Sequence, residues 1–242
     1  MPVRSLADRV SEFLSVTATE RSALERLGDR ERPVRRGMTL VRENDPTNDL
    51  VMLKSGMMIA YTLLDDGSRQ ILRLVFPGDL MGMAVLAYGK APHTVAAVAD
   101  SVVASFDRSQ LTEIAQKFPR VAMALTALDQ VDRAALTDRL AAVGRTSARA
   151  RIAATLLDIR NRLRRGDPSI RNSFSLGLTQ EEIGDATGLT AVHVNRMLRQ
   201  LEDQKLIERA AGRVTILDET ELKRAANHVD RQDGVDLSWL PA

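Results

Sequence analysis

The chain has 242 residues, of which 44% are hydrophobic and 27% are charged, enough for one large or two modest globular domains. It contains no cysteine, which excludes disulfides, thiolate catalysis, Cys-ligated zinc and Cys-ligated iron–sulfur clusters. Residues 145–217 contain 13 Lys/Arg and eight Asp/Glu, a net +5, so the rest of the chain carries −3 within the total of +2. A basic region of this kind favours a polyanionic partner.

No apolar run approaches the roughly 20 residues that a membrane helix needs. The first ten residues, MPVRSLADRV, carry charges where a signal peptide would have its apolar segment. We therefore expect a cytoplasmic protein of bacterial type that has no membrane partner.

Two short amphipathic helices are expected at 7–14 and 19–27, and Thr17 forms a capping box with Glu20 before the second. The pattern then changes to short β-like segments, which lie at 50–54, 57–64, 70–76, 94–99 and 101–106. Turns at Asp65–Gly67 and Pro77–Asp79 separate some of them. Many short strands at this spacing predict an antiparallel barrel or sandwich.

A long helix is predicted next. Asp107 and Gln110 form a capping box, and Pro119 suits the first turn of a helix that runs without Gly or Pro to about Val143. Its apolar residues form two stripes, one of Val121, Leu125 and Leu128 and the other of Leu136, Leu140 and Val143. We expect this helix to pack on a second copy of itself; the alternative is that it lies on its own barrel.

After a further helix at 147–165, the chain contains the pattern of a helix-turn-helix. Thr179 and Glu182 form a capping box, which predicts that a helix begins at Gln180. Gly188 ends that helix, because glycine adopts the left-handed conformation without steric cost. Thr190 then caps a second helix that runs to about residue 204.

The second helix has two faces. Its buried stripe consists of Val194, Met197, Leu198 and Leu201, and its opposite face consists of Ala191, Val192, Asn195, Arg196 and Arg199. Arg can pair with guanine, Asn with adenine, and Val can contact the thymine methyl group, so this face fits the major groove. Two strands at 209–218 would form a wing that brings Arg213 near the phosphate backbone. The alternative is an ordinary helical bundle with a solvated arginine face.

These segments resemble a known family. LTQEEIGDATGLTAVHVNRMLRQLEDQKLI followed by GRVTILD resembles the DNA-binding domain of the Crp–Fnr transcription regulators, and LKSGMMIAYTLLDDGSRQILRLVFPGDLMG resembles that family's cyclic-nucleotide-binding-type β-roll. The resemblance covers roughly residues 20–218. It implies an α+β fold with an antiparallel β-roll of the double-stranded β-helix or jelly-roll type at 1–118 and a long dimerisation helix at 119–144. A winged helix-turn-helix at 145–218 and a C-terminal helix with an exposed tail at 219–242 complete it.

The resemblance also implies roles for residues. The family's base-contacting arginine corresponds to Arg196, and Val192 stands where many members have an acidic base-reading residue, so the operator should differ from that of such members. His193 is either a phosphate neighbour or a partly packed surface residue. The expected DNA contacts are Thr179, Gln180, Thr190, Ala191, Val192, His193, Asn195, Arg196, Arg199 and Arg213.

The effector site departs from the family pattern. Cyclic-AMP binders have Gly-Glu and, eleven residues after the Gly, Arg followed by Ser or Thr; here Gly82 precedes Met83, and His93 and Thr94 stand in the later positions. Without the ribose-binding Glu and the phosphate-binding Arg, cyclic AMP binding is not expected. The candidate effector-pocket residues are Met81, Gly82, Met83, His93, Thr94, Leu136 and Thr137. Several methionines in this region indicate either an apolar pocket or flexible core filling.

An enzyme is the first rival interpretation. The histidines, His93, His193 and His228, are far apart, and no HExxH, GxSxG, P-loop or dinucleotide fingerprint occurs, so we expect no catalytic site, metal site or cofactor. The expected function is a sequence-specific transcription regulator that binds a roughly palindromic operator as a homodimer. RNA polymerase is an expected partner, and the small-molecule effector is unidentified. The alternatives are a ligand-independent regulator controlled by abundance and a ligand-binding module with vestigial DNA binding.

Overall fold

The computed structural model describes residues 4–227 and 229–241, and it divides into two compact units. The first, here called the β-roll unit, contains 4–62, 74–134 and the C-terminal segment from Arg231. The second, here called the helix-turn-helix unit, contains 63–73 and 135–230.

The β-roll unit begins with two short helices, α1 (Leu6–Ser11) and α2 (Ala18–Arg26). The capping box of Thr17 and Glu20 is present at the start of α2, which confirms the prediction. The apolar residues of both helices are buried in one hydrophobic cluster together with residues of the sheet and of the long helix. The helices are therefore an integral part of this unit.

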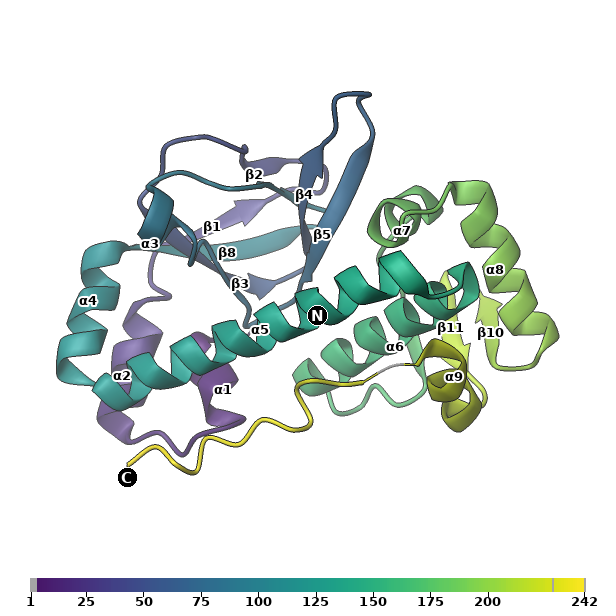
Figure 1. Cartoon of the computed structure of the whole chain (residues 1–242). Coiled ribbons are helices and arrows are strands. Elements are labelled where there is room, and N and C mark those ends of the chain that lie inside the picture. The colour runs from purple at the N-terminus through teal and green to yellow at the C-terminus, as the bar shows by residue number, and fades with distance from the viewer. Residues whose placement is uncertain (1–3, 228, 242) are drawn as a thin grey trace. The chain divides into compact units, whose positions relative to one another are not determined.

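Two four-stranded antiparallel sheets form the β-roll (Figure 1), with strand orders β1-β8-β3-β6 and β2-β7-β4-β5. The strands are Glu31–Val34 (β1), Thr39–Val41 (β2), Asp49–Ser55 (β3), Met58–Leu63 (β4), Arg69–Val75 (β5), Leu80–Met81 (β6), Thr94–Ala97 (β7) and Ser101–Asp107 (β8). All five predicted strands are found, which confirms the antiparallel β-roll. The sequence did not indicate β1, β2 and β6, because each has only two to four residues.

Glycines at two tight turns adopt the left-handed conformation that the turns require. Gly67, with φ of 81°, lies in the turn between β4 and β5, and Gly78, with φ of 93°, lies before β6. Asp79 accepts a hydrogen bond from the backbone N–H of Phe76 at 3.0 Å and stabilises the second turn. The predicted turns at Asp65–Gly67 and Pro77–Asp79 are therefore confirmed.

Two further helices follow the β-roll, α4 (Arg108–Lys117) and the long helix α5 (Pro119–Arg145). The predicted capping box precedes α4, where Asp107 and Gln110 bond reciprocally. The first apolar stripe of α5 is buried in the β-roll unit, as the alternative interpretation of this helix expected; its buried residues are Val121, Ala124, Leu125 and Leu128. The second stripe is exposed: Leu136, Leu140 and Val143 are 43%, 75% and 39% accessible.

Besides residues 63–73 and the part of α5 from residue 135, the described part of the helix-turn-helix unit contains four helices and a small antiparallel sheet of order β10-β11-β9. Its elements are α6 (Ala148–Gly166), β9 (Ser173–Ser175), α7 (Gln180–Thr187), α8 (Ala191–Asp203), β10 (Ile207–Ala210), β11 (Arg213–Ile216) and α9 (Glu219–Ala226). Helix α6 contacts α7, α8 and α9 and contributes more buried apolar residues than any other element of the unit. The strand β9 was not predicted.

The C-terminal segment differs from the expectation of an exposed tail. Helix α9 ends at Ala226, as expected for a short helix, but Leu237 and Leu240 farther along are buried. Both belong to the hydrophobic cluster of the β-roll unit. The prediction was wrong for the tail because its few apolar residues give no pattern that distinguishes the buried leucines from exposed residues such as Trp239.

Candidate nucleic-acid interface

The helix-turn-helix is built by local sequence signals. Thr179 accepts a hydrogen bond from the backbone N–H of Glu182 at 3.1 Å, and the Glu182 carboxylate accepts one from the Thr179 backbone at 2.7 Å. Gly188 ends α7 with φ of 66°, in the left-handed region. Thr190 caps α8 by accepting from the backbone N–H of His193 at 3.3 Å. The predicted caps and the glycine joint are all present.

The joint also depends on a glycine that the sequence analysis missed. A Cβ atom on Gly184 would lie 2.3 Å from the carbonyl oxygen of Leu189, a distance that no side chain tolerates. The backbone N–H of Leu189 donates to the Gly184 carbonyl at 3.0 Å, so the two segments touch directly. Close approach of two backbones is a tertiary feature, and the only local signal was a glycine inside an otherwise helical segment.

Helix α8 has one buried side and one exposed side, as the periodicity of its sequence predicted. Val194, Leu198 and Leu201 are buried, with at most 3% exposure, and Met197 is half-buried. On the other side Ala191, Val192, His193, Arg196 and Arg199 are exposed, and Asn195 is half-buried. Val192 is 78% exposed, although it is apolar. A branched apolar side chain held in solvent beside two arginines is suited to contact with a base edge.

The wing is fixed to α8 by an ion pair. Arg209 of β10 lies 2.6 Å from the Glu202 carboxylate at the end of α8, and the Arg209 hydrogen bond lowers the pKa of Glu202. Arg213 of β11 is exposed and donates to the backbone carbonyl and the hydroxyl of Ser173 in β9, at 2.8 and 3.1 Å. Strand β9 therefore orients Arg213, the arginine that was predicted to lie near the phosphate backbone.

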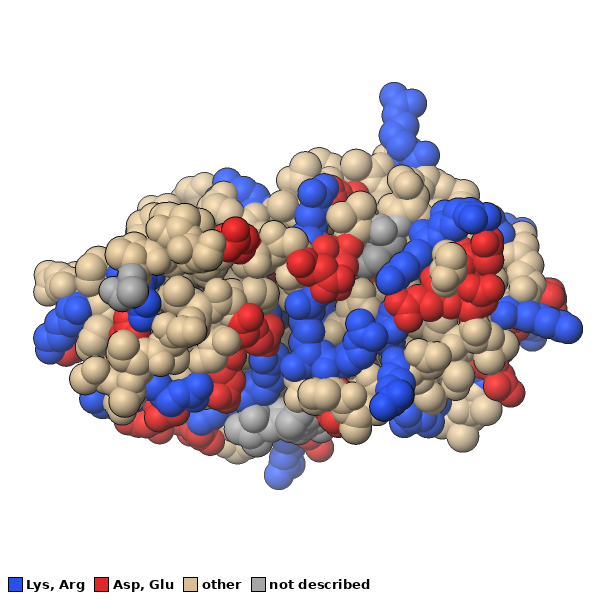
Figure 2. All heavy atoms as spheres, turned by 90° about the horizontal axis from the view of Figure 1, so that it is seen from below, with Lys and Arg blue, Asp and Glu red and all other residues tan. Residues whose placement is uncertain are grey.

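Charged side chains of both signs are interspersed over the face shown in Figure 2, where blue and red atoms alternate. On this face, general positive charge is a weak argument for nucleic-acid binding. The stronger argument is the local placement of arginines on the exposed side of α8 and on the wing.

The far end of α7 is held by contacts that the sequence did not indicate. The Nε atom of Arg69 in β5 donates to the Asp185 carboxylate at 2.7 Å. Arg139 of α5 donates to the backbone carbonyls of Leu72 and Ala186, at 3.2 and 2.8 Å. Desolvation lowers the pKa of the Arg139 guanidinium. These contacts within the helix-turn-helix unit orient α7 from the side opposite its N-terminus.

The interior of the β-roll is filled by its own side chains. Met81 and Thr94 lie on β6 and β7, and the core cluster around them consists of Val34, Leu53, Met58, Val75, Met81, Val95, Ala97 and Val103. Met52, Met57 and Met58 are also buried, which agrees with core filling rather than with an open apolar pocket.

The candidate effector residues have different surroundings in the structure. His93 is exposed, and Thr94 accepts a hydrogen bond from the backbone N–H of Glu43 at 3.0 Å. Gly82 has φ of 90°, and Met83 packs against the cluster formed with α1 and α2. Leu136 and Thr137 are exposed on α5 and belong to the other compact unit.

Among residues 4–227 and 229–241, no group of three His, Cys, Asp or Glu residues could hold a metal ion. Within the same ranges no helix is both long and apolar enough to cross a bilayer. His93 and His193 lie on different units, and His228 lies outside the described residues.

An antiparallel β-roll, a long helix and a winged helix-turn-helix together define a two-domain DNA-binding transcription regulator. The family model of the cyclic nucleotide-binding domain matches residues 31–118, and that of the Crp-like helix-turn-helix domain matches residues 150–225. The chain belongs to the Crp–Fnr family of transcription regulators. The resemblance stated from the sequence is thereby confirmed.

Relatives cover most of the chain. The fumarate and nitrate reduction regulatory protein of Escherichia coli (strain K12) is 25% identical over 209 residues, which are 86% of this chain and 83% of that protein. The structure of FixK2 from Bradyrhizobium japonicum matches with a TM-score of 0.71 and 26% identity, covering 81% of this chain and 96% of that one. A Crp-family transcriptional regulator from Thermus thermophilus matches with a TM-score of 0.60, 26% identity and the same coverage. The chain is a regulator of this type and not an enzyme.

Proposed function

We propose that this regulator binds a roughly palindromic operator as a homodimer and reads its sequence with the exposed face of α8. The observation that carries the proposal is the combination of Val192, Asn195 and Arg196 on one accessible side of a helix whose other side is buried. A helix with this division fits the major groove. In a bacterial cell the DNA partner places the protein in the cytoplasm, and RNA polymerase is the further partner that transcription regulation requires.

Different residues would serve different parts of the contact. Arg196 would pair with guanine O6 and N7, Asn195 with adenine, and Val192 with a thymine methyl group. The capped N-terminus of α7, with Thr179 and Gln180, would approach a phosphate, because the first backbone N–H groups of a helix have no carbonyl partner within the helix. Thr190, Ala191, His193, Arg199 and Arg213 would contribute the neighbouring backbone contacts.

A binding experiment tests the proposal directly. An operator would first be selected from a pool of random DNA duplexes, and its affinity would then be compared with that of a scrambled duplex at several salt concentrations. We expect a preference of at least about 1,000-fold and a steep loss of affinity with salt. Failure to enrich any sequence would contradict sequence-specific binding and would favour a vestigial DNA-binding domain.

The homodimer is supported by the exposed side of α5. Met123, Leu136, Leu140 and Val143 are apolar and accessible in the single chain, with Leu140 75% exposed. Apolar residues repeated along an exposed helix are usually covered by another helix. Pairing two copies through α5 would also place two identical α8 helices on one duplex, as a palindromic site requires.

Replacing Leu140 with Asp is expected to raise the dimer dissociation constant at least about tenfold, because it buries a charge in the proposed interface. Sedimentation velocity over a concentration series would measure the change. Leu64→Asp is the matched control, since Leu64 is 53% exposed at the β4–β5 turn. A wild-type protein that is monomeric at all concentrations, or a Leu140→Asp protein that dimerises normally, would contradict the proposed interface.

We further propose that cyclic AMP is not the effector. Met83 and His93 stand where the family's cyclic-AMP binders have the ribose-binding Glu and the phosphate-binding Arg, and the β-roll core is packed. Control would then come from the amount of protein or from a different ligand.

Cyclic AMP at millimolar concentration is therefore expected to leave the melting temperature of the protein unchanged. A ligand that binds only the folded state raises the melting temperature by mass action, so a thermal-shift assay measures the result. The variant Met83→Glu/His93→Arg restores the two missing groups and tests whether the cassette alone limits binding. A clear shift of the wild-type protein would contradict the proposal.

A further inference from the structure

The C-terminal segment begins in one compact unit and ends in the other. Asp230 belongs to the helix-turn-helix unit, and the residues from Arg231 onward belong to the β-roll unit. The Asp230 carboxylate accepts hydrogen bonds from the Asn161 amide at 2.8 Å and from the Arg165 guanidinium at 3.1 Å. Both partners lie on α6, so this end of the segment is attached beside the helix-turn-helix.

The other end of the segment is attached to the β-roll unit. Leu237 and Leu240 are 4% and 7% exposed and are buried in the cluster that contains residues of α1, α2 and α5. The carbonyl oxygen of Pro241 accepts a hydrogen bond from the Arg120 guanidinium at 3.2 Å. Arg120 also pairs with Glu20 at 2.6 Å, which lowers the pKa of Glu20. Apolar and polar contacts therefore attach the last described residues of the chain to the β-roll unit.

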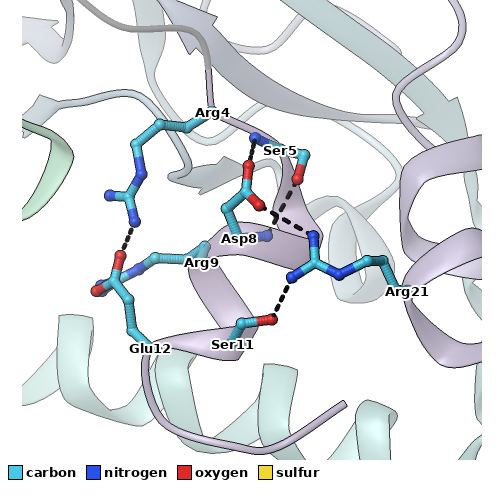
Figure 3. Close-up of polar contacts among 7 residues, drawn as sticks. All are labelled: Arg4, Ser5, Asp8, Arg9, Ser11, Glu12 and Arg21. Atoms are coloured by element: carbon cyan, nitrogen blue, oxygen red, sulfur yellow. Dashed lines mark hydrogen bonds and ion pairs between the residues drawn. The ribbon is translucent and has the colours of Figure 1, made fainter. Parts of the chain in front are cut away.

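The surface that receives the leucines has its own polar framework (Figure 3). The capping box of Ser5 and Asp8 begins α1, and Arg21 of α2 donates to Asp8 at 3.1 Å and to Ser11 at 3.0 Å. None of these contacts involves the C-terminal segment. Removal of the segment should consequently leave a formed apolar surface rather than an unfolded unit.

The covalent length of the segment sets a limit. Seven residue steps separate Asp230 from Leu237, and an extended chain spans at most about 3.3–3.6 Å per residue, so the two attachment points cannot be more than about 25 Å apart. This limit is independent of the arrangement of the two units. It holds only while both ends are attached.

We propose that the C-terminal segment is an intramolecular strap that restrains the helix-turn-helix unit relative to the β-roll unit. The chain already crosses from one unit to the other within β4, within β5 and within α5, and the strap adds a further connection between Asp230 and Arg231. A further connection that is attached at both ends reduces the relative motion that the other connections leave.

Attachment of the strap is expected to be readily reversible. The burial of two leucines favours it, but the ordering of eleven residues opposes it. The strap docks because the chain holds it close to its site, which raises its effective concentration there. Because the favourable burial and the unfavourable ordering nearly cancel, a small change in free energy elsewhere in the molecule can attach or release the strap.

The restraint can be measured because the chain has no cysteine. Spin labels at Gln116→Cys in α4 and Arg224→Cys in α9 would report one distance between the units, in dimers diluted with unlabelled protein. The variant Leu237→Ser/Leu240→Ser is expected to widen the distance distribution and to add longer distances. The control is Val229→Ser/Trp239→Ser, since Val229 and Trp239 are 61% and 60% exposed.

Trp239, the single tryptophan of the chain, gives a second measurement. Its fluorescence anisotropy is expected to fall in Leu237→Ser/Leu240→Ser, because the segment would then move independently of the β-roll unit. An unchanged anisotropy together with an unchanged distance distribution would overturn the strap. Circular dichroism would verify that the variant remains folded.

A strap that is attached before DNA arrives reduces the ordering that DNA must impose. Leu237→Ser/Leu240→Ser is therefore expected to weaken operator binding about three- to tenfold without changing its salt dependence. Unchanged or tighter binding would overturn this role of the strap. The operator measurement rests on the proposed function, whereas the distance measurement does not, so a wild-type protein without sequence preference would contradict only the proposed function.

Discussion

Arg196→Ala is expected to weaken operator binding by about 1–3 kcal/mol and to relax the preference at one base position. Arg196 is exposed on the same side of α8 as Val192, close to the capped start of the helix. A guanidinium there can donate two parallel hydrogen bonds to a guanine edge, and alanine would leave the guanine acceptors without that partner. Competition binding against the operator and its single-base variants would measure both effects.

Arg224→Ala is the matched control for loss of charge. Arg224 lies on α9 in the same unit, its side chain is 76% exposed, and it pairs with Glu221 on its own helix. It is expected to change operator affinity little and to leave the base preferences unchanged. If both variants lost affinity equally, the effect would come from net charge. If neither lost affinity, Arg196 would not be a base-contacting residue.

The helix-turn-helix could be predicted from the sequence because its signals lie close together along the chain. The capping boxes, Gly188 and the buried stripe of α8 depend on residues within one or two helical turns, and the structure contains each of them. The resemblance to the Crp–Fnr family added the order of the two domains, which the family models match.

Contacts between distant parts of the chain were not predictable. Arg69 and Asp185 are 116 residues apart, and nothing near either residue indicates the other. Strand β9 has three residues and is defined by its pairing with β11, while Gly184 is required by the approach of another backbone. The buried leucines of the C-terminal segment belong to the same class, because the cluster that holds them is built from distant parts of the sequence, including α1, α2 and α5.

Glu219→Gln is expected to lower the free energy of unfolding of the helix-turn-helix unit by about 2–3 kcal/mol near pH 7. Glu219 is the carboxylate partner of Arg160 at 2.8 Å, and Arg160 is 0% exposed. The Nε and Nη2 atoms of Arg160 have no acceptor among the described residues, so this single ion pair compensates a fully buried charge. Urea unfolding followed by circular dichroism would measure the loss.

The same pair should make stability depend on pH in the acid range. The hydrogen bond from Arg160 lowers the pKa of Glu219 from 4.5 to about 2, and Lys223 at 2.7 Å contributes as well. Because the pKa is lower in the folded state, the stabilisation is complete above about pH 4.5 and is lost as the pH falls towards 2. The difference in stability between wild type and Glu219→Gln should therefore shrink over this interval.

Glu221→Gln is the control variant for the stability loss. It changes a carboxylate in the same way on an exposed ion pair of α9 and should lower the free energy of unfolding by less than about 0.5 kcal/mol. Equal losses for the two variants would show that the buried position of Arg160 has no special effect.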